Sequence, residues 1–264
     1  LYPPTRGGYR VNLASVYILL SRVYLYMERW DDAVDAAGKA IVLSPGLSDY
    51  TALSTPFYLA TYDLDEVEWL YGSSSINLSS GLTTLGFSPS ADLLSRYDPA
   101  DKRLQFWFVL SSKRITKANI PSVRPSCAIR VSEALLNRAE AITRQENGDL
   151  AAALADLNLL RRNRVTGYAN VNITDRQLLR AEILLERRLE LCFEVHRWFD
   201  LRRLGMPAIS HRYRDSNASP WATYTLNERD PLYTLPIPND MIEHNNALRQ
   251  NESAYGPERT ASSL

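Results

Sequence analysis

Apolar residues near the start of the chain recur at helical spacing. A first helix is expected within residues 13–27, where one side collects Leu13, Val16, Tyr17, Leu20, Tyr24 and Met27. A second helix is expected between Asp31-Asp32 and Pro45-Gly46, with one side that collects Ala33, Ala37, Ala40 and Ile41. Because alanine is small, the large Tyr and Leu side chains of the first helix can pack closely against the second. This register predicts a tetratricopeptide-like helical pair within residues 1–45.

A second helical pair and a longer helix are predicted over residues 126–205. Residues 133–144 lead through Asn147-Gly148-Asp149 into a helix whose apolar side carries Ala153, Leu157 and Leu160. Residues 174–177, Thr-Asp-Arg-Gln, then fit a capping box, in which the Thr and Gln side chains satisfy backbone N–H groups. From there an amphipathic pattern rich in Glu and Arg continues to Gly205, which predicts one helix of about 30 residues.

Two long segments lack helical periodicity. Residues 46–125 contain short aromatic or β-branched runs at 68–71 and 105–109, separated by Ser, Gly and Pro, and we expect loops with a few short strands there. Residues 206–264 are rich in Pro, Asn and Tyr and are expected to form an irregular C-terminal tail. The whole pattern predicts a mostly α fold, with tetratricopeptide-like helical pairs and long irregular insertions, in a single domain over residues 1–264.

The composition excludes several classes of protein. The 264 residues include 30 Lys and Arg against 30 Asp and Glu. A net charge of zero argues against nucleic-acid binding, which needs a basic surface to neutralise phosphates. Two Cys and three His neither form a disulfide framework nor indicate a metal site, so no metal and no cofactor are expected. No segment is predicted to cross a membrane, because the uncharged stretch at 69–91 is rich in Ser, Thr, Gly and Asn.

Four glutamates lie at i, i+4 spacing along the long predicted helix, namely Glu182, Glu186, Glu190 and Glu194. A di-iron bundle would need Glu-x-x-His there, but Phe193 stands three residues before His196. Arginines stand among these glutamates, so we interpret the stripe as an ion-pair network. Hydrolase, phosphate-loop and zinc-protease motifs are absent, and we expect no enzyme. The sequence does not exclude a pair of carboxylates that catalyses glycoside hydrolysis, because the separation of the two groups is a three-dimensional property.

Aromatic rings in the irregular segments are the candidate ligand-binding residues. Such rings can stack on the apolar faces of sugars, and the candidates are Phe87, Trp107, Tyr213, Trp221 and Tyr224. Packing in the core is the alternative for each ring, above all for Trp107, which stands in a short apolar run. Trp221 and Tyr224 are the stronger candidates, because they stand in a polar loop where an exposed ring needs a reason.

Residues 186–203, ERRLELCFEVHRWFDLRR, closely resemble the signature helix of the SusD/RagB family of outer-membrane nutrient-binding lipoproteins. Residues 130–141 look like that family's strand-to-helix entry into a repeat, and residues 97–103, YDPADKR, match its Asp-x-Arg segment. Leu235-Pro236-Ile237-Pro238 and the asparagines after it resemble the family's C-terminal tail. The matching residues of the signature helix are expected to be structural, and they are Glu186, Arg187, Glu190, Glu194, Arg197 and Asp200.

The resemblance implies a non-catalytic protein at the cell surface, tethered to the outer membrane by an N-terminal lipid. Such a protein serves nutrient uptake and polysaccharide utilisation: it binds an oligosaccharide or polysaccharide and delivers it to a SusC-like TonB-dependent transporter. The chain starts near the middle of the family's pattern, so the lipid-bearing cysteine is expected to lie outside it and the domain to be N-terminally incomplete.

Two alternatives concern the ligand. A tetratricopeptide scaffold that binds only protein or peptide partners is the alternative to a glycan-binding protein. Among glycans, the charge pattern favours a neutral sugar, because the charges are concentrated in the Glu–Arg helix and the aromatic-bearing loops are left uncharged.

Overall fold

The computed structural model describes residues 11–54, 67–71, 88–112, 114–117, 127–214, 216, 218–245, 247–256 and 262–263. The chain divides into two compact units, Leu1–Arg197 and Trp198–Leu264, and each is described by itself. The first unit is helical, and the second is built around a small antiparallel sheet. Among the described residues, no helix combines the length and the apolar character that crossing a membrane requires.

The predicted N-terminal helical pair is confirmed. Helix α1 spans Leu13–Tyr26 and helix α2 spans Trp30–Leu43. Asn12 caps α1, because its side chain accepts from the backbone N–H of Ser15 while the Ser15 hydroxyl accepts from the N–H of Asn12. The two helices pack through a shared cluster in which Ile18 of α1 contacts the small residues Ala37 and Ala40 of α2.

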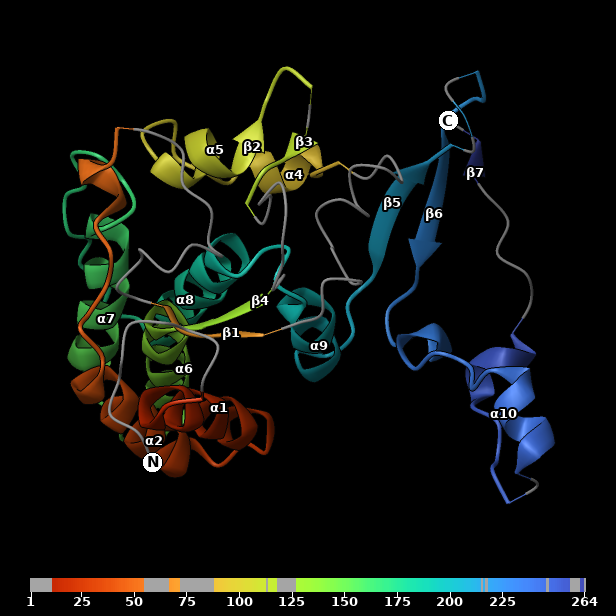
Figure 1. Ribbon diagram of the computed structural model, residues 1–264, viewed down its shortest axis with the longest axis horizontal. Coiled ribbons are helices and arrows are strands. Elements are labelled where there is room, and N and C mark those ends of the chain that lie inside the picture. The colour runs from red at the N-terminus through yellow and green to blue at the C-terminus, as the bar shows by residue number, and fades with distance from the viewer. Residues whose placement is uncertain are drawn as a thin grey trace. The chain divides into compact units, whose positions relative to one another are not determined.

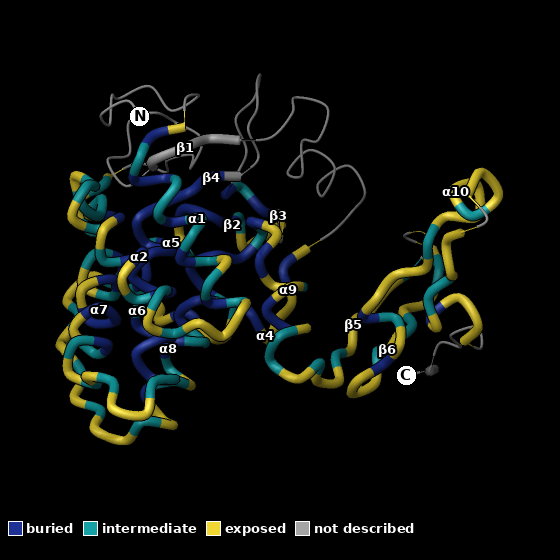
Figure 2. Tube along the Cα trace, turned by 90° about the horizontal axis from the view of Figure 1, so that it is seen from below, coloured by how far each residue is buried: buried dark blue, intermediate teal, exposed yellow. Residues whose placement is uncertain are grey.

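The second helical pair is also confirmed. Helix α6 spans Val131–Arg144, α7 spans Leu150–Arg162, and α8 begins at Arg176 and ends at Glu190. Helix α6 is central, because it contacts α1, α2, α7 and α8 (Figure 1). Its residues are buried on nearly every side, whereas the turns at the edge of the unit are exposed (Figure 2). Asp149 caps α7 by accepting from the N–H groups of Ala151 and Ala152.

The long helix predicted up to Gly205 is interrupted. Helix α8 ends at Glu190 and helix α9 spans His196–Arg203, while Phe193 and Val195 between them have φ angles of 60° and 69°. Buried cations stabilise the interruption, because the Lys117 ammonium donates to the backbone carbonyls of Glu190 and Cys192. The amphipathic pattern continues through the break, so periodicity alone predicted one helix where there are two.

Residues 46–125 contain short elements, as expected, although one was assigned the wrong type. They include the 3-10 turn η1 Tyr50–Ala52, β1 Val67–Tyr71, α4 Ala91–Leu94, α5 Lys102–Trp107, β2 Phe108–Val109 and β3 Arg114–Ile115. Strand β1 pairs with β4, Cys127–Arg130, and β2 pairs with β3. The run at 105–109 was predicted as a strand, but α5 continues to Trp107. The Asp101 side chain starts this helix by accepting from the N–H of Arg103.

The second unit is more regular than the predicted irregular tail. Strands β5 Ile209–Tyr213 and β6 Ala222–Leu226 form an antiparallel hairpin, and β7 Ser262–Ser263 pairs with the other edge of β6. Short helical turns follow the hairpin, namely η2 Pro231–Tyr233, α10 Asn239–His244 and η3 Glu252–Tyr255. Within this unit, Trp198 stacks on Tyr233 with ring centroids 5.0 Å apart.

Candidate functional site

A cluster of buried charges lies at the C-terminal end of α8. The Glu190 carboxylate contacts three guanidinium groups: Arg130 Nη1 at 2.6 Å, Arg164 Nη2 at 3.0 Å and Arg103 Nη1 at 2.8 Å. All four side chains are fully buried. A carboxylate removed from water needs such partners, because burying an unpaired charge is very costly.

Neighbouring acids extend this cluster. Glu186 contacts Arg103 at 2.6 Å and Arg161 at 2.8 Å. Glu194 contacts Arg130 at 2.8 Å and the Lys117 ammonium at 2.7 Å. The glutamate stripe therefore forms the predicted ion-pair network, and arginine suits it because the planar guanidinium can bind two carboxylates at once.

The electrostatics keep these glutamates charged. Burial would raise the pKa of Glu190, but the nearby charges of Arg164, Arg130 and Arg103 hold it well below its ordinary value. Burial likewise opposes ionisation of Glu194, and the Arg130 and Lys117 charges lower its pKa overall. A permanently ionised and fully paired carboxylate neither donates a proton nor accepts a new ligand. Within the described part of the chain, no group of three or more acidic, His or Cys side chains could hold a metal ion. The cluster thus braces the fold.

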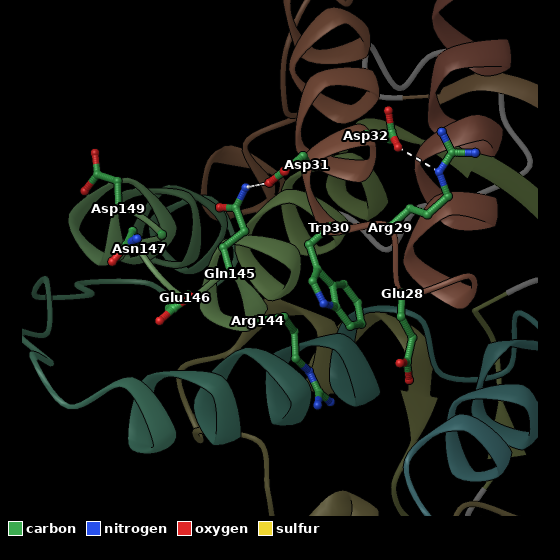
Figure 3. Close-up of a pocket in the computed structure, with 11 residues that line it drawn as sticks. Glu28, Arg29, Trp30, Asp31, Asp32, Arg144, Gln145, Glu146, Asn147 and Asp149 are labelled. Carbon is green, nitrogen blue, oxygen red and sulfur yellow. Dashed lines mark hydrogen bonds and ion pairs between the residues drawn. The ribbon is translucent and has the colours of Figure 1, made fainter.

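A polar groove lies where the turns of the two helical pairs meet. It has a volume of about 590 Å³ and is lined by residues 28–32 and 144–149 (Figure 3). The Arg144 guanidinium carbon lies 5.7 Å from the Trp30 ring centroid, and the Gln145 amide donates to Asp31 across the groove. Five carboxylates and two guanidinium groups line the walls, namely those of Glu28, Asp31, Asp32, Glu146, Asp149, Arg29 and Arg144.

The β5–β6 hairpin brings three of the predicted ligand-binding residues together. Tyr213 pairs with Ala222, and Tyr224 pairs with His211, so both tyrosines lie on one face of the sheet. Their rings meet edge to face, with centroids 6.1 Å apart. Trp221 precedes Ala222 and therefore lies on the opposite face. The exposed fractions are 51% for Tyr213, 42% for Trp221 and 38% for Tyr224, so all three rings are accessible.

Sequence reasoning missed the two arginines that accompany Trp221. The guanidinium carbons of Arg212 and Arg214 lie 5.0 and 4.5 Å from the Trp221 ring centroid. Strand β5 is mostly exposed and lacks the apolar alternation that marks a half-buried strand, so nothing in the pattern predicted the pairing. Had the hairpin register been known, the i, i+2 spacing of the arginines would have placed them together on one face.

The remaining two candidates do not join this hairpin. Phe87 lies outside the described residues. Trp107 is fully buried, which favours the alternative for this ring, packing in the core. Its ring packs edge to face on Tyr50, with centroids 6.1 Å apart, and the Lys117 ammonium lies 3.8 Å from its centroid. The Lys117 ammonium of the buried charge cluster therefore makes a cation–π contact with this ring.

Comparisons with solved structures place this fold among known proteins. A SusD superfamily protein from Parabacteroides distasonis aligns with a TM-score of 0.70 at 17% identity, over 96% of this chain and 65% of that one. A SusD-like carbohydrate-binding protein from Bacteroides vulgatus aligns with a TM-score of 0.57 at 21% identity, over 84% of this chain and 52% of that one. These likenesses show the predicted fold class, with paired helices and long insertions.

Sequence comparison agrees with the structural one. SusD-like protein P2 from Formosa agariphila is 32% identical over 133 residues, which make up 48% of this chain and 25% of that relative. This chain therefore matches a quarter of that relative's length. A profile of the SusD family matches residues 107–255, which include the buried charge cluster's glutamates and the hairpin. The chain belongs to the SusD family.

Proposed function

We propose that this chain is part of a non-catalytic glycan-binding protein and that the β5–β6 hairpin contributes to its ligand site. The observation that carries the proposal is the accessible group of rings on one hairpin, formed by Tyr213, Trp221 and Tyr224. An exposed aromatic ring offers an apolar face on which a sugar ring can stack. Exposing that face to water is unfavourable, and a ligand that covers it removes this unfavourable free energy. The name of the Bacteroides vulgatus relative, a SusD-like carbohydrate-binding protein, supports the same ligand class.

The absence of catalysis is part of this proposal. Glu190 of α8 is held by three buried arginines, so it is not available as the acid or the nucleophile of a glycosidase. The lowered pKa values of Glu190 and Glu194 suit bracing of the fold, because a general acid must hold its proton near neutral pH. We therefore expect the protein to bind oligosaccharide without cleaving it.

The cellular setting follows from family membership as a further proposal. The parent protein is attached to the outer membrane at the cell surface by an N-terminal lipid, and it delivers oligosaccharide to a SusC-like TonB-dependent transporter. Residues 1–264 then belong to one SusD/RagB-like domain. Co-purification of the parent with its transporter, after detergent extraction of the outer membrane, tests this arrangement.

Calorimetric titration across a panel of neutral and acidic oligosaccharides tests the ligand class. Chromatography of the same mixtures after long incubation looks for cleavage products. Saturable binding without products is the expected result. Release of shorter sugars would contradict a non-catalytic role, and failure of every glycan to bind would contradict the ligand class.

A scaffold for protein or peptide partners is the second candidate. The observation that favours it is the polar groove between the helical turns, which has a partly buried Trp30 and an excess of carboxylates. A basic peptide fits that chemistry. A chain that ignored all glycans but bound a basic peptide, with loss on Asp31→Asn, would favour this reading.

A further inference from the structure

The face of the β5–β6 hairpin that carries Trp221 is cationic. Residues on this face are Ser210, Arg212, Arg214, Trp221, Thr223 and Thr225, as the strand register and the contacts of the two arginines indicate. We call it the arginine face. None of its residues is acidic, and Arg212 forms no ion pair within the described part of the chain. Arg212 differs in this respect from the arginines of the buried cluster, each of which meets a carboxylate.

We propose that the arginine face binds the carboxylate or sulfate groups of an acidic polysaccharide. The inference rests on the proposed glycan-binding function and names the class of glycan. It departs from the neutral sugar that the charge pattern of the sequence favoured. That expectation treated the hairpin as uncharged because Arg212 and Arg214 were not connected with Trp221.

Stacking on an indole suits a guanidinium group for binding an anion. The guanidinium carbons lie over the Trp221 ring, 5.0 Å from its centroid for Arg212 and 4.5 Å for Arg214, within the range of a cation–π contact. A cation–π contact is electrostatic and leaves the five N–H donors of Arg212 able to bind a carboxylate or sulfate in bidentate fashion. Because the ring restrains both side chains, less conformational entropy is lost when the anion binds.

The opposite face of the hairpin, which carries Tyr213 and Tyr224, provides a contact for the sugar ring itself. Arg212 and Tyr213 are consecutive in β5, so they point to opposite faces, and β5 lies at the edge of the described sheet. A polysaccharide lying along that edge can place an anionic substituent against Arg212 and a sugar ring against Tyr213. The two faces therefore make separable contributions, one from charge and one from stacking.

Matched pairs of polysaccharides test the inference with the intact chain. Polygalacturonate and its methyl ester differ in free carboxylates, and carrageenan and its desulfated form differ in sulfate. We expect at least one acidic form to bind about tenfold more tightly than its neutral counterpart, with the difference shrinking as sodium chloride is raised. The pair that shows the preference identifies the anion as carboxylate or sulfate.

Arg212→Gln and Arg214→Gln should each reduce this preference severalfold while leaving affinity for the neutral form unchanged. Arg249→Gln is the matched control, because Arg249 is an exposed arginine of the same unit outside the hairpin. Trp221→Leu should weaken the preference in the same direction by releasing both guanidinium groups. Circular dichroism establishes that all the variants are folded, and retained binding of the neutral form does so as well for the two arginine variants.

Three results would overturn the inference, in distinguishable ways. Equal binding of acidic and neutral forms would remove it and leave the proposed function standing. A preference that Arg249→Gln reduces as much as Arg212→Gln would assign the effect to overall charge. If no polysaccharide of either kind binds, the proposed function fails and this inference fails with it.

Discussion

Arg103 Nη1 lies 2.8 Å from Glu190 Oε2, although the two residues are 87 positions apart in the chain and neither side chain reaches solvent. This contact joins α5, in the segment between the helical pairs, to the end of α8. The same carboxylate also binds Arg130, beside the start of α6, and Arg164, just after α7. One glutamate thus adds a polar connection between segments that the apolar clusters also join.

Neutralising Glu190 should therefore be strongly destabilising. Glu190→Gln leaves Arg103, Arg130 and Arg164 buried around a neutral amide, and we expect the free energy of unfolding to fall by about 3–5 kcal/mol. Urea denaturation followed by tryptophan fluorescence measures the loss. Asp35→Asn is the control, because the Asp35–Lys39 pair is exposed and its removal should leave stability nearly unchanged. Equal effects of the two substitutions would show that the buried cluster does not brace the fold.

The turn between α6 and α7 requires glycine at position 148. A Cβ atom there would lie 2.0 Å from the Ile142 carbonyl oxygen, which is backbone and has little freedom to move. We expect Gly148→Ala to lower the free energy of unfolding by about 1–3 kcal/mol.

Gly38→Ala, within α2, is the matched control for Gly148→Ala. The nearest contact of its new methyl group is Arg138 Nη1 at 4.0 Å, so helix propensity should make it neutral or stabilising by up to about 1 kcal/mol. Thermal denaturation of the pair should move in opposite directions, and a shared direction would count against this account of the turn.

Acid should destabilise the first unit in two steps. Burial, aided by the Arg187 and Arg22 charges and opposed by Glu133 and Glu194, lowers the pKa of His196 from 6.5 to about 4. The unfolded chain therefore takes up a proton before the folded chain does, and stability is lost as pH falls from 6.5 towards 4. The full contribution is about 3 kcal/mol and is present above pH 6.5.

The second step concerns Glu133. Burial opposes its ionisation, but the charge of Arg22, whose Nε lies 2.6 Å away, helps to lower its pKa from 4.5 to about 2. This contribution is complete above pH 4.5 and is lost as pH falls from 4.5 towards 2. Urea denaturation at a series of pH values measures both steps. His196→Asn should flatten the slope between pH 6.5 and 4, whereas His244→Asn, at an exposed position, should keep it. Identical slopes of the unfolding free energy against pH in the unsubstituted protein and in both variants would contradict the assignment to His196.

Local patterns were sufficient to predict the helical pairs and insufficient to predict what interrupts them. Ala37 and Leu157 belong to apolar repeats at helical spacing, because α2 and α7 each bury one side against a neighbour. In α1 the buried side carries Ile18 and Leu25, whereas Leu20 of the predicted side is only partly buried. The break after Glu190 depends on Lys117, which is 73 positions away and donates to the carbonyl that the break exposes. An interaction at that separation leaves no periodic trace, so the sequence alone predicted a continuous helix.

In the candidate site, too, local features could be predicted from the sequence and contacts between distant residues could not. Tyr213, Trp221 and Tyr224 could be predicted as separate rings in polar surroundings, and the hairpin register shows that two of them touch. The cationic character of the Trp221 face could not be predicted, because it depends on which strand residues point the same way. For Trp107 the sequence left two alternatives, because a ring in a short apolar run is typical both of a core and of a ligand-binding surface. Its burial against Tyr50 and Lys117 favours the core.

Trp107 and the hairpin tyrosines should respond to substitution in opposite ways. Trp107→Ala removes a fully buried ring that packs on Tyr50 and Lys117, so we expect the free energy of unfolding to fall by about 3–5 kcal/mol. Glycan affinity of the molecules that remain folded should be unchanged. Tyr224→Ala, at an exposed ring, should instead weaken glycan binding about two- to tenfold with little effect on stability. Calorimetric titration and thermal denaturation of both variants separate the two effects.

Tyr255→Ala is the matched control for Tyr224→Ala. It removes a ring that is 76% exposed in the same unit but outside the hairpin, and it should change neither glycan affinity nor stability. If Tyr255→Ala weakened binding as much as Tyr224→Ala, the ligand would not be held by the hairpin, whereas a loss specific to Tyr224 ties stacking to this sheet.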